Sequence, residues 1–341
     1  MNYIGIDHHK QYSHMTLMDE DGKVLKAGKV WNSRSEVEEF LKGTGEEVKA
    51  VIEAGRSSYA MVDLLDELGV NVTIAHPSEV RAIAKAKIKT DKRSSWMLAH
   101  LLRADLIPEV YTRPRENRQA QRVLRQRAFF VAIRTKVKNR IKSLLAQQSE
   151  EALRELSQVK NLFSKRGLEL LKQLDLASTD KPLLEASVKI YGHLEERIKE
   201  SDDLVKSLYK KIVEARLIDT VPGFDKFFSV LVATEIGDVG RFERPEKLHC
   251  YVGVVPSTYS SGERSYHGKI IKQGNKWLRW AAVEAVWPAI RADFDLRVFY
   301  ERQARRKNSN VAKVATAKRL LTIIYRILKE KREYIPYKRI K

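Results

Sequence analysis

The sequence predicts an N-terminal α/β domain, a central pair of long helices and a mainly helical C-terminal domain. Apolar runs bounded by turn residues alternate with a helical pattern up to about residue 110. Apolar residues then recur every seven positions between 111 and 214, and the rest is mostly helical. A chain of 341 residues is long enough for two or three domains. We therefore expect domains at 1–110, 111–214 and 215–341.

The first domain contains four apolar runs and one helical pattern. "YIGI" (3–6) predicts a strand, and "HMTLMDEDGKVLKAGKV" (14–30) predicts two strands joined at Asp21-Gly22. "VKAVIEA" (48–54) and "NVTIAH" (71–76) predict two more, separated by the helical "SYAMVDLLDELG" (58–69), which ends at Gly69. Three meandering strands followed by strand, helix and strand is the order of a ribonuclease H-like fold. The actin-like ATPase fold has the same order.

The central segment predicts a coiled coil. Residues 113–148 contain no glycine, and the only proline is at the start, which favours one long helix. Apolar residues spaced by seven form a seam that we expect to drive dimerisation. In the first helix these are Val123, Phe130, Val137 and Leu144; in the second they are Leu184, Tyr191, Ile198, Val205 and Ile212.

The charge of the chain is strongly positive. Lys and Arg number 64 against 44 acidic residues, a formal net charge of +20, which suggests a nucleic acid or an acidic membrane surface as partner. The single cysteine, Cys250, allows no intrachain disulfide and no cysteine-based zinc cluster. The start resembles no signal peptide, and no apolar run reaches the roughly 20 residues that span a bilayer. We expect a cytoplasmic protein.

Three acidic residues lie where they could share a metal ion. Asp7 and Glu53 each end a predicted strand, and in a ribonuclease H-like sheet these strands are neighbours. Asp91 precedes an apolar helical run, where it is either a helix-start residue or a third ligand. Adjacent strand residues face opposite sides, so at most one of His8 and His9 can join Asp7. We favour a surface role for both histidines.

The C-terminal domain contains two further candidate segments. "STYSSGERSYHGKIIKQGNK" (257–276) predicts a Gly/Ser-rich loop whose serines need a base or metal before they act as nucleophiles. Its cations, which could offset charge on a phosphate, are Arg264, Lys269, Lys272 and Lys276. "VPGF" (221–224) is compatible with a phosphate-binding turn and equally with a plain turn between helices.

Six motifs in order carry a family resemblance. They are "GIDHHK", "VIEAG", "KTDKRSS…LLRADLIPEVY", "TVPGF…EIGDVGRF", "YVGVVPSTYSSG" and "GKIIKQGNKWLR". Together they resemble the DEDD transposases of bacterial and archaeal insertion sequences, which are related to the Piv/MooV invertases. The resemblance covers nearly the whole chain and implies a RuvC-like (ribonuclease H-like) N-terminal domain and a C-terminal transposase domain.

The resemblance also implies site residues. Asp7, Glu53 and Asp91 match the first three catalytic, Mg²⁺-binding acids, and Ser94 occupies the position of the fourth. Ser261 matches the serine nucleophile, with Ser260 as its neighbour. The implied reaction is DNA cleavage and exchange through a covalent serine–DNA intermediate, at a site assembled from different domains. With Ser94 in the fourth position, we expect cleavage to be slow or absent.

The implied partners are donor and target DNA, a structured guide ("bridge") RNA, and further copies of the chain in a dimer or a pair of dimers, with no membrane. The residues expected to bind nucleic acid are Arg118, Arg122, Arg125, Arg134, Lys138 and Lys272. Three alternatives stay open: a catalytically inactive nucleic-acid-binding scaffold, a RuvC-like junction nuclease, and an actin-like ATPase. The ATPase interpretation lacks the glycines that its phosphate loop needs, because "IDHHKQYS" contains none.

Overall fold

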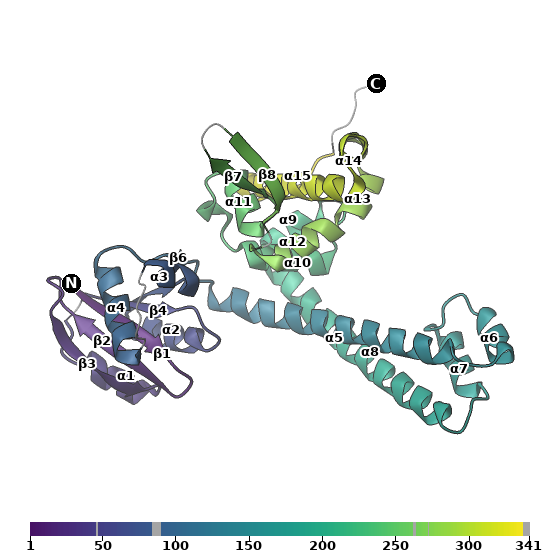
Figure 1. The fold of residues 1–341 in the computed structure, drawn as a ribbon, viewed down its shortest axis with the longest axis horizontal. Helices are drawn as coiled ribbons and strands as arrows, with labels where there is room; N and C mark the ends of the chain where they lie inside the picture. The colour runs from purple at the N-terminus through teal and green to yellow at the C-terminus, as the bar shows by residue number, and fades with distance from the viewer. Residues whose placement is uncertain (46, 84–89, 262–263, 272, 337–341) are drawn as a thin grey trace. The chain divides into compact units, whose positions relative to one another are not determined.

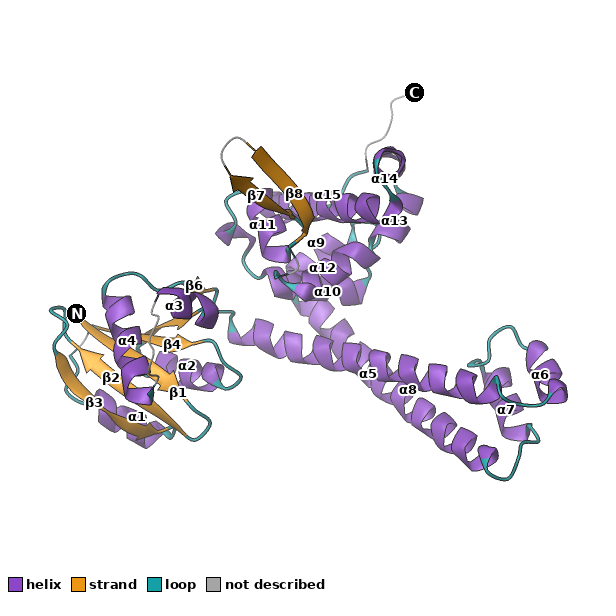
Figure 2. Ribbon diagram, viewed as in Figure 1, coloured by secondary structure: helices purple, strands orange, loops and turns teal. Residues whose placement is uncertain are grey.

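The structure is a computed structural model that describes residues 1–341 except 46, 84–89, 262–263, 272 and 337–341 (Figure 1). The chain divides into two compact units, Met1–Arg113 and Pro114–Lys341. The first unit is built on a sheet and the second is mostly helical (Figure 2). This mixed α/β and α architecture confirms the predicted fold class at that level.

Unit 1 is organised around a six-stranded sheet with the order β3-β2-β1-β4-β5-β6. The first three strands form an antiparallel meander, β4 and β5 run parallel to β1, and β6 is antiparallel at the edge. The strands are β1 (Asn2–His8), β2 (Tyr12–Met18), β3 (Val24–Trp31), β4 (Val48–Glu53), β5 (Asn71–Ala75) and β6 (Glu109–Val110). All five strands expected from the sequence are present.

Helices cover both faces of this sheet. They are α1 (Arg34–Leu41), α2 (Ser58–Glu67), α3 (Pro77–Ile83) and α4 (Asp91–Arg103). Ile4 and Ile6 of β1 pack in one core with Phe40 of α1 and Leu65 of α2. A second core on the other face contains Val51 of β4, Val80 of α3 and Leu98 of α4. The sheet is therefore the middle of three layers.

Gly5 permits α4 to lie against β1. A Cβ at this position would be 1.9 Å from the carbonyl oxygen of Ser95 and 2.4 Å from the backbone nitrogen of Ala99. Both atoms belong to the helix backbone, which cannot move aside as a flexible side chain can. The contact fixes the start of α4, and with it Asp91, relative to the strand that carries Asp7.

Unit 2 begins with two long helices that pair within the chain. They are α5 (Arg115–Leu145) and α8 (Asp180–Lys211), joined through α6 (Glu150–Ser157) and α7 (Lys165–Gln173). Arg127 pairs with Asp202, and Arg134 Nη1 lies 3.1 Å from Glu195 Oε1. Residue numbers in α8 fall as those in α5 rise along these pairs, so the two helices are antiparallel.

The intrachain pairing buries the seam predicted for α8, since Leu184, Tyr191, Ile198 and Val205 are all buried. The α5 side differs from the prediction. Its seven-residue repeat from Val123 to Leu144 is only half-buried, whereas the fully buried positions include Leu124, Ile141 and Leu145. The packed face of α5 is thus centred nearer Leu124 than Val123, and the seam does not need a second chain to cover it.

The rest of unit 2 is a helical bundle with one β-hairpin. Its elements are α9 (Val213–Asp219), α10 (Lys226–Ile236), the short 3₁₀ helix η1 (Val239–Arg241), α11 (Pro245–Val252), β7 (Pro256–Ser261), β8 (Arg264–Ile270), α12 (Lys276–Glu284), α13 (Val286–Ala292), α14 (Phe294–Arg306) and α15 (Ser309–Glu330). α10 is buried nearly all round, and the inner face of α15 packs in the same core. The "VPGF" segment is the turn between α9 and α10, where Gly223 has a φ of +96° and a Cβ would lie 2.3 Å from the carbonyl oxygen of Ala285.

The segment predicted as a Gly/Ser-rich loop is instead a hairpin. β7 and β8 pair antiparallel, with Ser261 opposite Arg264. The prediction was wrong because polar, Gly-containing stretches lack the apolar alternation that reveals a half-buried strand.

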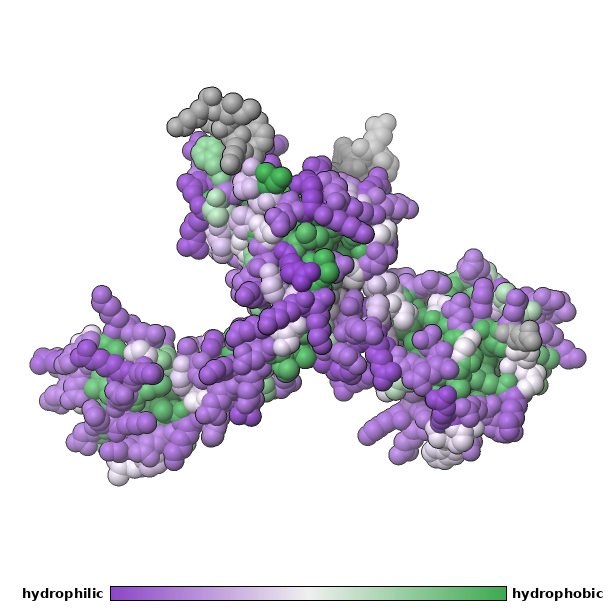
Figure 3. Space-filling model, turned by 180° about the vertical axis from the view of Figure 1, so that it is seen from behind, coloured by the Kyte–Doolittle hydropathy of each residue, from purple (hydrophilic) through white to green (hydrophobic). Residues whose placement is uncertain are grey.

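Surface chemistry agrees with the high charge. In Figure 3 hydrophilic residues cover most of the visible face of the molecule. Within the described ranges, none of the helices is both long and apolar enough to cross a membrane.

Candidate metal and nucleic-acid sites

The sheet of unit 1 brings two of the predicted acids to neighbouring strand ends. β1 and β4 are parallel neighbours, and Ile6 lies opposite Ile52 in their register. Asp7 and Glu53 are the next residue of each strand. Because residues in register on parallel strands point to the same face, both carboxylates leave the sheet on one side at the same edge.

Asp7, His9 and Asp91 converge near this edge. One ligand atom from each lies within 4.8 Å of the others. His9 Nε2 is 3.1 Å from Asp91 Oδ2 and 4.0 Å from Asp7 Oδ2. Glu53 is not a member of this group of described residues, although it follows Ile52 on the neighbouring strand.

Asp91 is both a helix-start residue and a member of the cluster. It is the first residue of α4, whose N-cap is Thr90; the Thr90 side chain accepts a hydrogen bond from the Arg93 amide. The Tyr12 hydroxyl donates a hydrogen bond of 3.1 Å to Asp91 Oδ2. This bond to a carboxylate raises the pKa of Tyr12 above its usual value. The two interpretations of Asp91 are therefore compatible.

Ser94 and Ser95 have different surroundings. Ser94 is half-buried one turn into α4, and its backbone amide donates to the Thr90 carbonyl at 2.8 Å. The Ser95 hydroxyl is fully buried and lies 2.8 Å from both His14 Nδ1 and Thr16 Oγ1 of β2. Burial lowers the pKa of His14. Ser95 therefore joins α4 to the sheet, whereas Ser94 lies three residues after Asp91, at a position that neighbours it on the helix surface.

His9 is the residue of this cluster that the sequence interpretation did not select. It follows β1 with the same parity as Asp7, so it returns to the same side. His8 faces the other way, with Nδ1 2.9 Å from Ser13 Oγ, and burial lowers its pKa. The alternation in "GIDHHK" was the available signal, and it distinguishes His9 from His8.

The predicted nucleophile lies on the hairpin of unit 2. Ser261 is the last residue of β7, paired in register with Arg264; Ser260 is paired with Ser265. Lys272 lies outside the described residues. The two predicted chemical centres, the acids and the serine, therefore belong to different compact units.

A polar network lies beyond the end of this hairpin. Asn275 caps α12 by accepting hydrogen bonds from Trp277 and Leu278, and its Nδ2 donates to Glu235 Oε2 at 2.8 Å. Glu235 is completely buried in α10, and its Oε1 accepts a hydrogen bond of 2.9 Å from Arg125 Nη2. A residue of the basic helix α5 is thereby connected to the segment that follows β8.

The cations of α5 divide between two faces. Arg125 pairs with Glu235, Arg134 pairs with Glu195, and Lys138 Nζ lies 4.8 Å from the centre of the Phe163 ring. Arg118 is half-buried and also has a partner. Arg122 is exposed, and its role in binding nucleic acid stays a prediction. Three more exposed cations continue along the helix: Lys136, Arg140 and Lys142.

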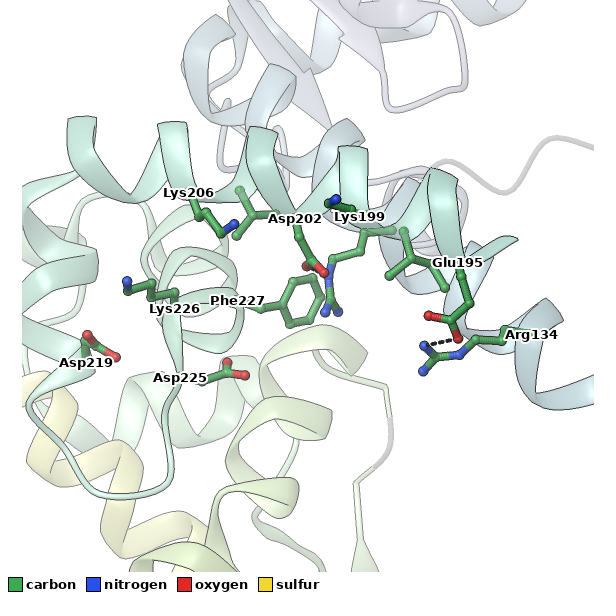
Figure 4. A pocket seen from close by; sticks show the side chains of 12 residues that line it. Arg134, Glu195, Lys199, Asp202, Lys206, Asp219, Asp225, Lys226 and Phe227 are labelled. Carbon is green, nitrogen blue, oxygen red and sulfur yellow. Dashed lines mark hydrogen bonds and ion pairs between the residues drawn. The ribbon is translucent and has the colours of Figure 1, made fainter. Parts of the chain in front are cut away.

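A hollow of about 650 Å³ lies beside α5, α8 and the start of α10 (Figure 4). It is lined by both cations and acids, and several of these already bind one another. Arg127 pairs with Asp202 and lies 4.4 Å from the centre of the Phe227 ring. The dashed line in Figure 4 marks the pair between Arg134 and Glu195. These inward cations hold the helices together.

Comparison with known proteins gives two family-model matches along the chain. A family model described as "Transposase", of the DEDD type, matches residues 4–149, and the model of the "Transposase IS116/IS110/IS902 family" matches residues 215–301. The first match contains Asp7, Glu53 and Asp91, and the second contains Ser261.

Individual relatives extend the similarity to nearly the full length. The chain is 26% identical to the transposase for insertion sequence element IS1328 of Yersinia enterocolitica, over 94% of this chain and 95% of the relative. It is 23% identical to the transposase for insertion sequence element IS1111A of Coxiella burnetii, over 97% and 90%. An insertion element IS116 protein of Streptomyces clavuligerus is 23% identical over 98% and 96%. The chain belongs to the DEDD transposase family of insertion sequences.

The donors of the unit 1 cluster fit the divalent cation that this family typically uses. Two carboxylates supply oxygen ligands and negative charge, and an imidazole nitrogen is a common third ligand. The half-exposed position of the cluster leaves room for water and substrate oxygens to complete the coordination.

Proposed function

We propose that this protein is a DNA recombinase of an insertion sequence that cleaves and rejoins strands with the help of Mg²⁺. The observation that supports this most strongly is the convergence of Asp7 and Asp91 at the strand end beside Glu53. By resemblance, these three positions correspond to the first three acids of the family. Convergent carboxylates at the edge of a sheet are suited to holding the divalent ions used in phosphoryl transfer.

Unit 1 is the ribonuclease H-like, RuvC-like part of this enzyme. The proposal is supported by the strand order β3-β2-β1-β4-β5, with an antiparallel meander followed by parallel strands. It is also supported by the position of Asp7 on the central strand, next to the strand that ends at Glu53.

The proposed chemistry divides between the two units. Asp7, Glu53 and Asp91 would hold Mg²⁺, which would supply positive charge to the oxygens of the scissile phosphate. Ser261 Oγ attacks the phosphorus, so that an Oγ–P bond forms while the bond from phosphorus to a deoxyribose oxygen breaks. The hydroxyl proton passes to solvent, and the leaving oxygen takes one up. Because the acids and the serine belong to different domains, the site is assembled only when nucleic acid is bound, from several copies of the chain.

The partners follow from charge and family. The exposed cations of α5 bind phosphates of donor and target DNA and of a structured guide RNA. The active form is a dimer or a pair of dimers. Because the α8 seam is already buried within the chain, the coiled coil joins subunits through another face; Leu183, Ile190 and Leu204 are exposed there. Light scattering of the purified protein should give at least twice the chain mass, and a monomer mass would contradict this part.

The departure at Ser94 makes the proposal testable. In the native chain we expect slow or undetectable Mg²⁺-dependent formation of a covalent protein–DNA adduct. Ser94→Asp adds the fourth carboxylate next to Asp91 and should raise adduct formation by tenfold or more, about 1.4 kcal/mol in the barrier. The measurement is a denaturing gel with end-labelled DNA, with Ser95→Asp as the control that disrupts the buried contact to β2.

Ser261→Ala in the Ser94→Asp background should abolish the adduct. If the adduct persists, the nucleophile is another residue, with Ser260 tested next by Ser260→Ala. Equal activity with serine and aspartate at position 94 would show that the fourth ligand is supplied by another residue or is dispensable.

Ser94 also favours a second candidate function, a catalytically inactive nucleic-acid-binding scaffold. Binding without cleavage in both the native chain and Ser94→Asp would support it. A four-way DNA junction included in the same assay tests the junction-nuclease alternative, which predicts cleavage of the junction without a covalent adduct.

A further inference from the structure

We propose that His9 is a metal ligand at the candidate site and offsets the carboxylate that is missing at position 94. The inference rests on the proposed metal-dependent function. It assigns a residue type that differs from the acids of the family pattern. It also explains how a chain without the fourth acid could retain a metal.

The geometry places the imidazole between the two carboxylates. His9 Nε2 is 3.1 Å from Asp91 Oδ2 and 4.0 Å from Asp7 Oδ2, and the three ligand atoms lie within 4.8 Å of one another. Ligands of one cation at about 2.0–2.2 Å are separated by roughly 3–4 Å. The spacing therefore needs little movement to become a coordination site.

The contact between His9 Nε2 and Asp91 Oδ2 is close but is not aligned as a hydrogen bond. The Nε2 atom is shielded from solvent and lacks hydrogen-bond alignment with any group that the structure describes, even though Asp91 Oδ2 is close. A nitrogen and an oxygen that lie close together without an aligned proton can each donate an electron pair to one positive ion between them. A divalent metal ion accepts electron pairs from both imidazole nitrogen and carboxylate oxygen.

Neighbouring side chains hold this arrangement. The Tyr12 ring centre lies 4.8 Å from that of His9, and the Tyr12 hydroxyl donates to Asp91 Oδ2. Lys29 Nζ lies 4.2 Å from the centre of the Tyr12 ring. Tyr12 therefore contacts two of the three proposed ligands, as outer residues do when they orient metal ligands.

Replacing a carboxylate by an imidazole changes the preferred ion. Mg²⁺ favours oxygen ligands, whereas Mn²⁺ and Co²⁺ also accept imidazole nitrogen. The site should therefore bind Mn²⁺ more tightly than Mg²⁺, and Mn²⁺ provides a spectroscopic probe of the ligands.

The experiment measures Mn²⁺ binding to the full-length chain by electron paramagnetic resonance, with pulsed detection of ¹⁴N coupling. We expect bound Mn²⁺ with a ¹⁴N signal in the native chain. His9→Ala should remove the signal and weaken binding on the order of tenfold or more. His8→Ala is the matched control, because His8 faces Ser13, and should retain both signal and affinity. His9→Gln serves as a second variant with a side chain of similar size, and circular dichroism confirms that each variant is folded.

The outcomes separate this inference from the proposed function. Bound Mn²⁺ without ¹⁴N coupling, or unchanged or tighter binding in His9→Ala, would overturn His9 as a ligand and leave metal-dependent chemistry standing. Tighter binding would mean that His9 competes with the ion as a positive charge. If neither the native chain nor Ser94→Asp binds Mn²⁺, the metal-dependent function itself fails. His9→Ala combined with Ser94→Asp should bind Mn²⁺ without ¹⁴N coupling.

Discussion

The polar groups of unit 1 and those of α5 in unit 2 are arranged in opposite ways. In unit 1, residues from β1 and α4 converge on one point, with ligand atoms of Asp7, His9 and Asp91 within 4.8 Å. Along α5 the cations diverge: Arg125, although 45% exposed, and Arg134 pair with acids of α10 and α8, whereas Arg122 and Lys136 lie on the helix surface.

The difference shows what positions each kind of site. The cluster in unit 1 is fixed by backbone topology, because a strand end and a helix start are brought together by packing that no single polar residue controls. The role of a cation on α5 depends on which face of the helix is buried. Arginines and lysines at nearby positions of α5 therefore have different roles.

The largest expected effect comes from breaking the convergence in unit 1. Gly5→Val would force branched carbons into the backbone of α4, where even a Cβ would be 1.9 Å from the Ser95 oxygen. We expect a loss of about 3 kcal/mol or more in the free energy of unfolding of unit 1. Urea denaturation followed by circular dichroism measures it. Gly28→Val is the control, because nothing lies within 4 Å of a Cβ there; a similar loss in both would show that α4 does not need this close approach.

The second largest expected effect tests whether the exposed cations of α5 bind nucleic acid. Replacing Arg122, Lys136, Arg140 and Lys142 by Gln removes exposed charge only, so nucleic-acid affinity should fall roughly a hundredfold near 0.15 M salt. The slope of log K against log salt should flatten by about one unit for each phosphate that the helix no longer neutralises. Fluorescence anisotropy with a labelled duplex measures both quantities.

The inward pair provides the matched comparison. Arg127→Gln and Arg134→Gln break the ion pairs with Asp202 and Glu195, so they should lower the melting temperature and leave the salt slope unchanged. A flatter slope from the inward pair, with none from the exposed set, would reverse the assignment of the two faces.

The smallest expected effect concerns His249, which lies in the core of unit 2, unlike the partly exposed His9 of unit 1. His249 of unit 2 is 2% exposed, and burial lowers its pKa to about 4. Between pH 6.5 and 4 the unfolded chain binds a proton that the folded one does not, so stability falls as the pH falls. We expect a loss of about 2 kcal/mol from pH 7 to pH 5. His249→Gln should reduce this dependence; an unchanged pH profile would mean that the other histidines account for it.

Much of unit 1 could be predicted from the sequence because its signals are local. Apolar runs, the Asp21-Gly22 turn and the acids at the ends of two strands are visible without knowing the fold. Helix α1 was not predicted, since it has few apolar residues; Val37 and Phe40 are the buried ones. His9 was not selected because the alternation of strand residues predicts only which face of the sheet His9 occupies. It does not predict that α4 places Asp91 on that face.

Unit 2 was harder because its arrangement depends on pairing. The seven-residue spacing of α8 identified the buried positions Ile198 and Val205, but spacing cannot tell whether the partner helix belongs to the same chain. The roles of Arg125 and Glu235 depend on a contact between residues 110 positions apart. No local pattern contains that information.

The unbroken length of α5 has a consequence of its own. A helix of 31 residues is roughly 46 Å long at 1.5 Å per residue. Duplex DNA advances about 3.4 Å per base pair, so this helix is as long as about 14 base pairs. Four of its exposed cations, Arg122, Lys136, Arg140 and Lys142, span a rise of about 30 Å. If a duplex lies parallel to this helix, these charges can contact phosphates along nearly one turn of it.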